Sequence, residues 1–390
     1  MRQLNYLEKL LEGVGTEWQA LSDLVTLRRG RVMSKGFLSE NTGIFPVYSS
    51  QTANDGMIGS IDTYDFDGEY ISWTTDGANA GTIFYRKGKF SITNVCGLMK
   101  IIDENLLNYK YLYYWLTTEA QKHVYSGMGN PKLMSHQVEK IVVPIPCPDN
   151  PKKSLAIQAE IVRILDAFTA MTAELTAELT AELNMRKKQY NYYRDQLLSF
   201  EEGDVEWKTL GDLAENLDSK RKPITGGLRE AGEIPYYGAS GIVDYVKDYI
   251  FDGDYLLVSE DGANLLARNT PIAFSISGKT WVNNHAHVLK FETYAERKYV
   301  EYYLNSIDLT PYISGAAQPK LNKKNLESIN IPNPAPKEKE RIVAILDKFD
   351  SLTCSIKEGL PREIELRQKQ YEYYRDLLLS FPKSHSHEAA

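Results

Sequence analysis

The second half of this 390-residue chain restates the first, and this duplication constrains the fold more than any other feature. The segment EWQALSDL, which begins at Glu17, returns as EWKTLGDL at Glu206, and FDGEYISWTTDGAN returns as FDGDYLLVSEDGAN. SGMGNPKL at Ser126 returns as SGAAQPKL at Ser314, and KKQYNYYRDQLLSF returns as QKQYEYYRDLLLSF. Each repeat holds a globular segment followed by a helical one, so the chain should fold as two similar halves.

Local patterns assign secondary structure within each repeat. EYISWTT, GTIFYR and FSITNVCGLMKII are β-branched and aromatic with Gly or Asp at their borders, which predicts strands. Residues 154–200 contain neither Pro nor Gly and predict one continuous helix, with PIPCPDNP and IPNPAP marking the two helix starts. Its apolar stripe is Ile161, Ile164, Leu165, Phe168, Met171, Leu175, Leu179 and Leu183.

The predicted fold class is α+β, with two globular mixed α/β domains separated by a pair of long antiparallel helices. The helices should bury their apolar stripes against each other as a coiled-coil spacer, and the duplication gives the molecule an internal pseudo-two-fold repeat. Trp18 and Trp207 occupy equivalent positions, and we assign both to packing.

The sequence TAEL occurs three times in succession over residues 172–183. Each unit adds about 6 Å of helix and about 40° beyond one full turn, close to the roughly 35° per base pair of B-DNA. The tandem is therefore predicted to set the spacing of the two domains in steps near one base pair. A plain helix-forming run with Glu facing solvent is the alternative. The matching part of the second helix contains Gly359 and Pro361, so that helix should be kinked or interrupted.

Charge and cysteine content limit the possible classes of protein. The chain has 45 Lys and Arg against 52 Asp and Glu, a net charge of -7 that as an average disfavours nucleic acid, although local basic clusters survive it. Cys96, Cys147 and Cys354 show no CxxC spacing, so we expect reduced packing residues. An apolar run of about 18 residues and a basic leader are both missing, which predicts a cytoplasmic protein.

Basic and amide residues in turns are the candidate DNA contacts, because they suit phosphates or base edges. Solvated surface charge, or an Asn that satisfies its own turn, is the alternative at any single position. The candidates are Arg28, Arg29, Arg31, Lys35, Asn79 and Lys132 in the first half, and Lys220, Arg221, Lys222, Asn264, Lys320, Lys323 and Lys324 in the second.

Motifs for catalysis, metal binding and nucleotide binding give only weak matches, so no catalytic or metal-binding residue is predicted. AFSISGKT, at Ala273, resembles a phosphate-binding loop with Ala at the first Gly position, and we interpret it as a β-hairpin turn at Gly278. His285 and His287 can share a strand face without a third ligand at metal spacing. Methyltransferase motifs of the Asn-Pro-Pro-Tyr type are lacking, which favours a DNA reader over a modification enzyme.

Taken together, the paired domains, the openings IPxP…IVxILDxF, the TAEL repeats and the twin QYxYYRDxLLSF endings resemble the specificity subunit of type I restriction-modification systems, most closely the IC subfamily. Two positions depart from the family pattern. Gln158 before the first IV is replaced by Lys339 before the second, and the usual Gly-x-x-Gln reads Asn130 in the first half and Gln318 in the second.

The resemblance implies a non-catalytic subunit that recognises a bipartite asymmetric DNA target and directs adenine-N6 methylation or cleavage by its partners. It implies two modification subunits and, in the full complex, restriction subunits, with S-adenosylmethionine, ATP and Mg on those partners. The candidate partner-binding residues, in the repeated helix ends, are Tyr192, Tyr193, Arg194, Tyr373, Tyr374 and Arg375, and packing between helices of the same chain is the alternative for them. A coiled-coil scaffold without DNA specificity is the alternative.

The expected domain organisation follows the repeats. It comprises a conserved segment at 1–16, a first target-recognition domain at 17–150, a first helical region at 151–203, a second target-recognition domain at 204–335, a second helical region at 336–382 and a flexible tail at 383–390.

Overall fold

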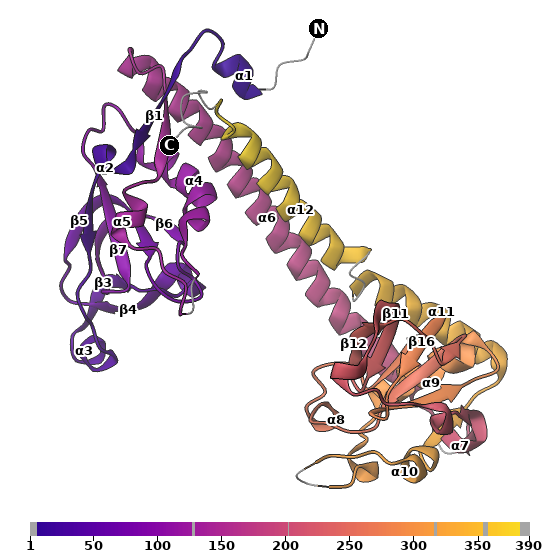
Figure 1. Cartoon of the computed structure of the whole chain (residues 1–390). Coiled ribbons are helices and arrows are strands. Elements are labelled where there is room, and N and C mark those ends of the chain that lie inside the picture. Colours follow the sequence, from indigo (N-terminus) through magenta and orange to yellow (C-terminus); the bar gives the residue numbers. More distant parts are fainter. Residues whose placement is uncertain (1–5, 127–128, 202, 316–317, 354–357, 383–390) are drawn as a thin grey trace. The chain divides into compact units, whose positions relative to one another are not determined.

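The computed structural model describes residues 6–126, 129–201, 203–315, 318–353 and 358–382. The chain divides into two units, Met1–Ala177 with Glu365–Ala390, and Glu178–Ile364. The fold is α+β, with the long helix α6 (Pro151–Leu198) between two sheet-rich domains, as predicted (Figure 1). The boundary between the units falls inside the TAEL tandem. Cys354 and the expected tail at 383–390 lie outside the described residues.

A six-stranded sheet forms the centre of the first unit, in the order β2-β7-β5-β6-β3-β4. Its strands are β2 (Val25–Arg29), β3 (Thr42–Tyr48), β4 (Met57–Ile61), β5 (Phe66–Thr74), β6 (Ile83–Ile92) and β7 (Cys96–Ile101). A separate antiparallel pair joins β1 (Thr16–Ala20) to β8 (Val142–Pro146), which brings the two ends of the sheet-rich segment together.

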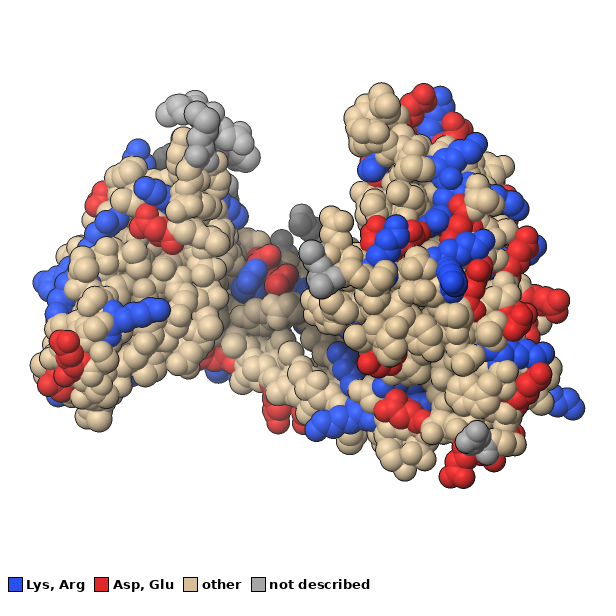
Figure 2. Space-filling view, turned by 90° about the horizontal axis from the view of Figure 1, so that it is seen from below, with Lys and Arg blue, Asp and Glu red and all other residues tan. Residues whose placement is uncertain are grey.

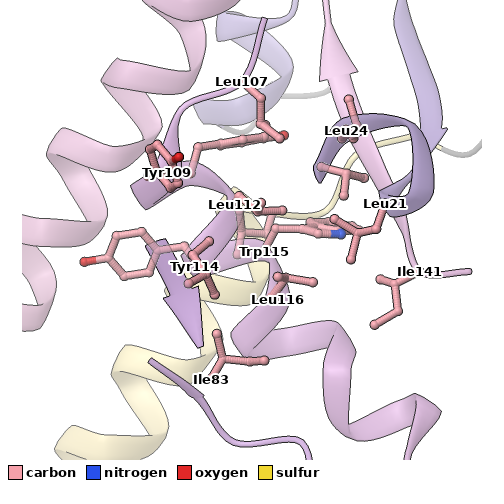
Figure 3. Close-up of a cluster of buried hydrophobic side chains, with 14 of the residues drawn as sticks. Leu21, Leu24, Ile83, Leu107, Tyr109, Leu112, Tyr114, Trp115, Leu116 and Ile141 are labelled. Carbon is pink, nitrogen blue, oxygen red and sulfur yellow. The ribbon is translucent and has the colours of Figure 1, made fainter. Parts of the chain in front are cut away.

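The core of the first unit lies between this sheet and helix α4 (Tyr109–Glu119), which contacts β5 and β6 (Figure 3). Tyr111, Leu112 and Leu116 of α4 are fully buried, at 0% exposure. The polar ends of the core aromatics are also satisfied, because the Tyr111 hydroxyl donates to Pro144 O at 2.7 Å and Trp115 Nε1 donates to Val142 O at 2.9 Å. These two bonds tie α4 to β8.

The second unit repeats this plan with the sheet divided in two. One sheet has the order β10-β17-β14-β15 and the other β12-β11-β16-β13. The strands are β10 (Glu215–Asn216), β11 (Ala231–Gly238), β12 (Gly241–Val246), β13 (Phe251–Asp252), β14 (Tyr255–Ser259), β15 (Ala273–Ile276), β16 (Lys279–Val282) and β17 (Ala286–Lys290). The pair β9 (Glu206–Thr209) and β18 (Asn330–Asn333) corresponds to β1 and β8, and helix α9 (Tyr294–Ser306) corresponds to α4.

The second helical region consists of two helices, α11 (Pro336–Thr353) and α12 (Gly359–Leu378). Gly359 has a φ of +79°, a left-handed conformation that favours glycine, so the predicted interruption is confirmed. The remaining helices are short: α1 (Tyr6–Leu10), α2 (Leu21–Leu24), α3 (Lys35–Glu40), α5 (Ser135–Val138), α7 (Leu210–Leu213), α8 (Asn264–Ala267) and α10 (Lys323–Glu327). Among the described helices, none is both long and apolar enough to cross a membrane.

The helical regions pair within each unit. In the first unit the end of α12 runs antiparallel to the start of α6, where the rings of Phe168 and Tyr374 lie 5.7 Å apart and Tyr371 Oη lies 3.1 Å from Thr169 Oγ1 (Figure 1). In the second unit the end of α6 packs on α11, where Tyr193 stacks on Phe349, also at 5.7 Å. The two aromatic contacts occupy equivalent positions of the repeat, which confirms the predicted pairing of the apolar stripes.

Three packing predictions need correction. The turn at Gly278 is not a hairpin, because β15 pairs with β14 and β16 pairs with β11 and β13. Gly278 has a φ of +78° and bends the chain from one sheet into the other; Gly88, with a φ of +94°, lies at the equivalent place in β6. Trp18 packs edge-on against Trp115 at 5.5 Å, but Trp207 is 44% exposed. Met171 of the predicted stripe is 64% exposed.

Candidate nucleic-acid interface

Four segments of the first unit meet at one end of its sheet: residues 28–35, 49–56, 76–81 and 129–132. We call this set the first loop rim. Arg31 forms a β-bridge with Thr93, whose hydroxyl donates to Ser49 Oγ at 2.9 Å. Asn79 Nδ2 donates to Ser50 O at 3.1 Å, and Gly77 N donates to Pro131 O at 3.0 Å. These contacts bring together the segments that carry Arg31, Asn79 and Lys132.

Most basic side chains of the first loop rim are exposed. Arg28, Arg29 and Lys35 face solvent, and the side chain of Lys132 is 52% exposed with its Nζ 3.9 Å from Asp76. Arg31 is also exposed, but it already pairs with Asp65 at 3.0 Å. Ion pairs of this exposure are weak, so a phosphate can replace the carboxylate at small cost.

The second unit builds an equivalent set from residues 220–222, 238–241, 261–264 and 318–324. We call this set the second loop rim. Asp261 forms a β-bridge with Lys320, and Gly262 N donates to Pro319 O at 3.2 Å, as Asp76 and Gly77 do in the first unit. Trp281 Nε1 donates to Lys222 O at 2.5 Å and holds the basic segment against β16. Lys220, Lys222, Lys320, Lys323 and Lys324 are exposed.

Acidic and basic side chains alternate over the surfaces seen in Figure 2, which fits the net charge of -7. The described lysines illustrate this. Lys320 Nζ lies 3.0 Å from Glu260, and Lys323 Nζ lies 3.6 Å from Glu327. Ion pairs therefore offset part of the positive charge of the second loop rim.

Three predicted contact residues have internal partners instead. Asn264 both donates to and accepts from the backbone of Thr270, at 3.0 Å each, and Asn79 holds residue Ser50 as described above. Arg221 is largely buried, at 13% side-chain exposure, and pairs with Glu260 at 2.6 Å and Asp218 at 3.3 Å. These side chains shape the loops. Asn264 matches the alternative of an Asn that satisfies its own turn, whereas Asn79 joins its turn to a different loop.

The buried cluster around Arg221 also contains His287, whose Nδ1 lies 2.6 Å from Asp218 and whose Nε2 lies 2.7 Å from Leu321 O. Both acceptors are satisfied when each ring nitrogen carries a proton. Burial raises the pKa of Asp218, but the hydrogen bond and charge of His287 outweigh it, so the pKa falls below 3.8. The pKa of Glu260 is lowered in the same way by Arg221 and Lys320.

Asp218, Glu260 and His287 have the donor types and proximity of a metal site, since their ligand atoms lie within 4.8 Å of one another. The two carboxylates, however, already pair with the guanidinium of Arg221 and, at Glu260, with Lys320. These cations neutralise the carboxylates where a metal would need them. His285, the other histidine considered, is half-exposed and pairs with Asp261 at 2.9 Å.

His287 makes the hydrogen bond that Trp73 makes in the first unit, although the two residues lie on different strands of the equivalent strand pairs. It lies opposite Val258 in the β14–β17 pair, and the equivalent β5–β7 pair places Trp73 opposite Gly97. Trp73 Nε1 donates to Leu133 O at 2.9 Å, just as His287 bonds Leu321 O. Both side chains are completely buried. The two units therefore fix equivalent loops through one hydrogen bond made by two different residue types.

In each unit an aspartate of the helical region accepts hydrogen bonds from the sheet-rich domain, a role that was not predicted from the sequence. Asp166 of α6 accepts from Tyr114 Oη at 2.7 Å and from Lys110 Nζ at 2.5 Å. Asp347 of α11 accepts from Tyr302 Oη at 2.6 Å and from Tyr294 Oη at 2.8 Å. Both aspartates belong to the repeated ILD triplet, and that repetition was the available signal.

The family departure at Gln158 and Lys339 has a structural account. Gln158 is fully buried and bonds Asn108 N and Leu106 O, both at 2.9 Å, which fixes the loop before α4. Lys339 is 4% exposed and its Nζ lies 3.5 Å from Glu296 of α9. Either residue joins the start of the helical region to the domain beside it.

The repeated helix ends present the same surface twice. Tyr192 and Tyr373 are 62% and 65% exposed, and each ring meets the next tyrosine at 5.4 Å. Arg194 and Arg375 each bond the following aspartate and lie over a tyrosine ring one turn earlier. Tyr193 and Tyr374, by contrast, pack on Phe349 and Phe168. Tyr193 and Tyr374 still expose 45% and 41% of their surface, so both tyrosines of each pair are accessible and the outer one is the more exposed.

Comparison with known proteins agrees with this architecture. Residues 15–185 and 202–366 match the family model for the type I restriction modification DNA specificity domain. The chain is 40% identical to the EcoR124I/EcoR124II specificity subunit of Escherichia coli, with 98% of each chain covered. It is 34% identical to a putative type I specificity subunit of Haemophilus influenzae, covering 96% of this chain and 98% of the relative.

Solved structures share the fold at low sequence identity. The specificity subunit of M. genitalium superposes with a TM-score of 0.52 at 16% identity, covering 98% of each chain. A chain from a study of complex assembly in a type I system superposes with a TM-score of 0.60 at 13% identity, covering 94% of this chain and 97% of that one. The chain belongs to the family of type I restriction-modification specificity subunits, the non-catalytic subunits that give these systems their DNA sequence specificity.

Proposed function

We propose that each sheet-rich domain reads one half of a bipartite, asymmetric DNA target through its loop rim. The observation that carries the proposal is that equivalent rims, built on equivalent backbone bonds, carry different side chains. Arg28, Arg29, Arg31, Lys35 and Lys132 would serve the first half-site, and Lys220, Lys222, Lys320, Lys323 and Lys324 the second. Two readers of different composition imply two different half-sites.

The partners in this proposal are two modification subunits that methylate adenine at N6, and restriction subunits in the full complex. S-adenosylmethionine, ATP and Mg would be bound by those subunits. The equivalent surfaces at Tyr192 with Arg194 and at Tyr373 with Arg375 support two like partners, because each offers an exposed tyrosine at the same position of the repeat. Because the target would be cellular DNA, we expect the complex in the cytoplasm. The three TAEL units favour the IC subfamily.

The spacing of the half-sites would be set by the helical regions. We expect the half-site centres about one helical turn, roughly 10 bp, apart, with a nonspecific gap of about 6 to 8 bp. The leucines of the TAEL tandem, Leu175, Leu179 and Leu183, are half-buried, whereas Glu174 and Glu178 are exposed. The leucines therefore form the less exposed side of the helix. One α-helix spans the whole tandem without a break.

Sequencing the methylated adenines in DNA from cells that express this chain with its modification subunit tests the proposal. The expected motif has two unlike half-sites and a fixed gap. DNA binding by the purified complex should also weaken steeply as salt rises, because phosphate contacts release counterions. A contiguous or palindromic motif, or binding that ignores salt, would contradict the proposal.

A further inference from the structure

The two loop rims differ in the length of one connection, which follows β3 in the first unit and the equivalent strand β11 in the second. In the second unit β11 and β12 are joined through Ala239 and Ser240 alone. In the first unit residues 49–56 connect β3 to β4, and residues 51–55 are all exposed. Tyr48 and Tyr237 hold the same register in the parallel pairs β3–β6 and β11–β16, so the two connections are equivalent.

The tip of this loop has a defined and uncommon backbone. Asn54 and Asp55 both have a φ of 50°, and Gly56 has a φ of +81°. Left-handed conformations are unfavourable for residues with a side chain, and Asn and Asp tolerate them best. Three such residues in succession need support from the surrounding structure.

Arg86 of β6 supports this backbone through hydrogen bonds. Its Nη2 donates to Asp55 O at 2.7 Å and its Nε donates to Ser72 Oγ at 3.0 Å. The guanidinium lies 3.6 Å from the ring centre of Tyr48 and 4.4 Å from that of Phe84. Arg86 is 5% exposed, and burial lowers its pKa. Within the described residues no carboxylate lies at ion-pair distance from it, so this buried cation is held mainly by rings and neutral oxygens.

The side chains at the tip are left without hydrogen-bond partners. Among the described residues neither the Asn54 amide nor the Asp55 carboxylate makes a side-chain hydrogen bond, while Gln51 is used internally on Met57 O at 2.5 Å. A carboxylate repels phosphates but accepts from the amino groups of cytosine or adenine in the major groove, and an asparagine amide pairs with adenine. The chemistry of the tip therefore suits base edges.

We propose that residues 49–56 form the base-reading loop of the first domain, with Asn54 and Asp55 as specificity-determining residues for amino-bearing bases and Arg86 as the positioning residue. This inference rests on the proposed function. It assigns the loop to one half-site alone, because the second unit lacks an equivalent of its length.

The test selects bound duplexes from a random-sequence pool with the full-length chain in complex with its modification subunit. Asp55→Asn keeps the tolerance for positive φ and should change the preference at one position of one half-site by about 5- to 150-fold, the range of one base contact. The other half-site and the gap should stay the same. Glu104→Gln is the matched control, since it removes an exposed carboxylate beyond the opposite end of β7 and should leave the motif unchanged.

Arg86→Gln tests the positioning role. Preference at the same half-site should relax over the positions that Asn54 and Asp55 read, while the second half-site remains as sharp as before; a purely structural role would weaken binding to every sequence alike. A wild-type bipartite motif that Asp55→Asn and Asn54→Ala leave unaltered overturns the inference alone. A wild-type complex that selects no bipartite motif overturns the proposed function, and the inference falls with it.

Discussion

At the scale of single residues, the two domains use different pairs of side chains for one task. Trp73 fills the space above Gly97, and His287 fills the space beside Val258, yet both end on the carbonyl oxygen of the equivalent leucine. Large and small residues therefore compensate each other across the central strands. Neither member of a pair can change size without affecting the other.

Gly97→Ala should destabilise the first unit by at least about 2 kcal/mol, because overpacking a filled core forces strained side chains. An ideal Cβ at Gly97 would lie 2.1 Å from the ring of Trp73, which is 0% exposed. Urea unfolding of the full chain would measure the loss. Gly129→Ala is the control, since no atom of the described residues lies within 4 Å of the place its Cβ would take. A Gly97→Ala chain as stable as wild type would contradict the packing described.

The buried cluster in the second unit predicts a pH dependence. The pKa of Asp218 is lowered in the folded chain, so its carboxylate stabilises the fold fully above the unfolded value of about 3.8 and loses that contribution as pH falls through the lowered value. Asp218→Asn should be less stable than wild type at neutral pH, and the difference should shrink below about pH 4. Unfolding midpoints at several pH values would show this, and a constant difference would be inconsistent with it.

At the scale of elements, the continuous helix, the interrupted one and the strands flanked by Gly and Asp could be predicted because each depends on local pattern. The turn at Gly278 could not, since its glycine suits a hairpin as well as the bend between two sheets that it forms. Asn79 and Asn264 lie in the predicted turns, but whether an amide faces a ligand or its own backbone depends on contacts distant in sequence. Arg86 gave no sign of its role for the same reason, whereas the only sign of the role of Asp166 was the repetition of its ILD triplet.

The TAEL tandem gives the element-scale prediction. Removing residues 176–179 deletes one four-residue unit, about 6 Å of helix and a rotation near that of one base pair. The preferred gap between half-sites should shorten by one base pair while both half-sites stay the same. Methylation motifs of the wild-type and shortened chains, compared in the same cells, would reveal the change. An identical gap in both would rule out a spacing role for the tandem.

At the scale of the whole molecule, duplication gives each unit a domain, a helix start and a helix end in the same relation. Asp166 and Asp347 join domain to helix start, and Phe168 with Tyr374 and Phe349 with Tyr193 join helix start to helix end. The ends of the chain's two helical regions are thus exchanged between units: the end of α6 serves the second unit, and the end of α12 serves the first. Each unit needs both halves of the sequence.

This arrangement predicts the partner stoichiometry. Tyr192→Ala should remove one of two modification subunits from the complex, and Tyr373→Ala the other, because the two rings offer equivalent exposed surfaces. Light scattering of the purified complexes would report a loss of one subunit in each variant and of both in the double variant. Tyr125→Ala, which removes an exposed tyrosine that pairs with Lys132 of the first loop rim, should keep both subunits. Unchanged stoichiometry in the double variant would place the partner surface elsewhere.

The exchange of Trp73 and Gly97 for Val258 and His287 has a consequence for inheritance. An ancestor of one domain could not have acquired the other's pair by single mutations without passing through either a clash or a void. Recombination that moves an entire domain carries both members at once and avoids that barrier. Descendants of such a chain should therefore vary in patches whose borders fall outside the sheets, at the helix starts near Pro151 and Pro336.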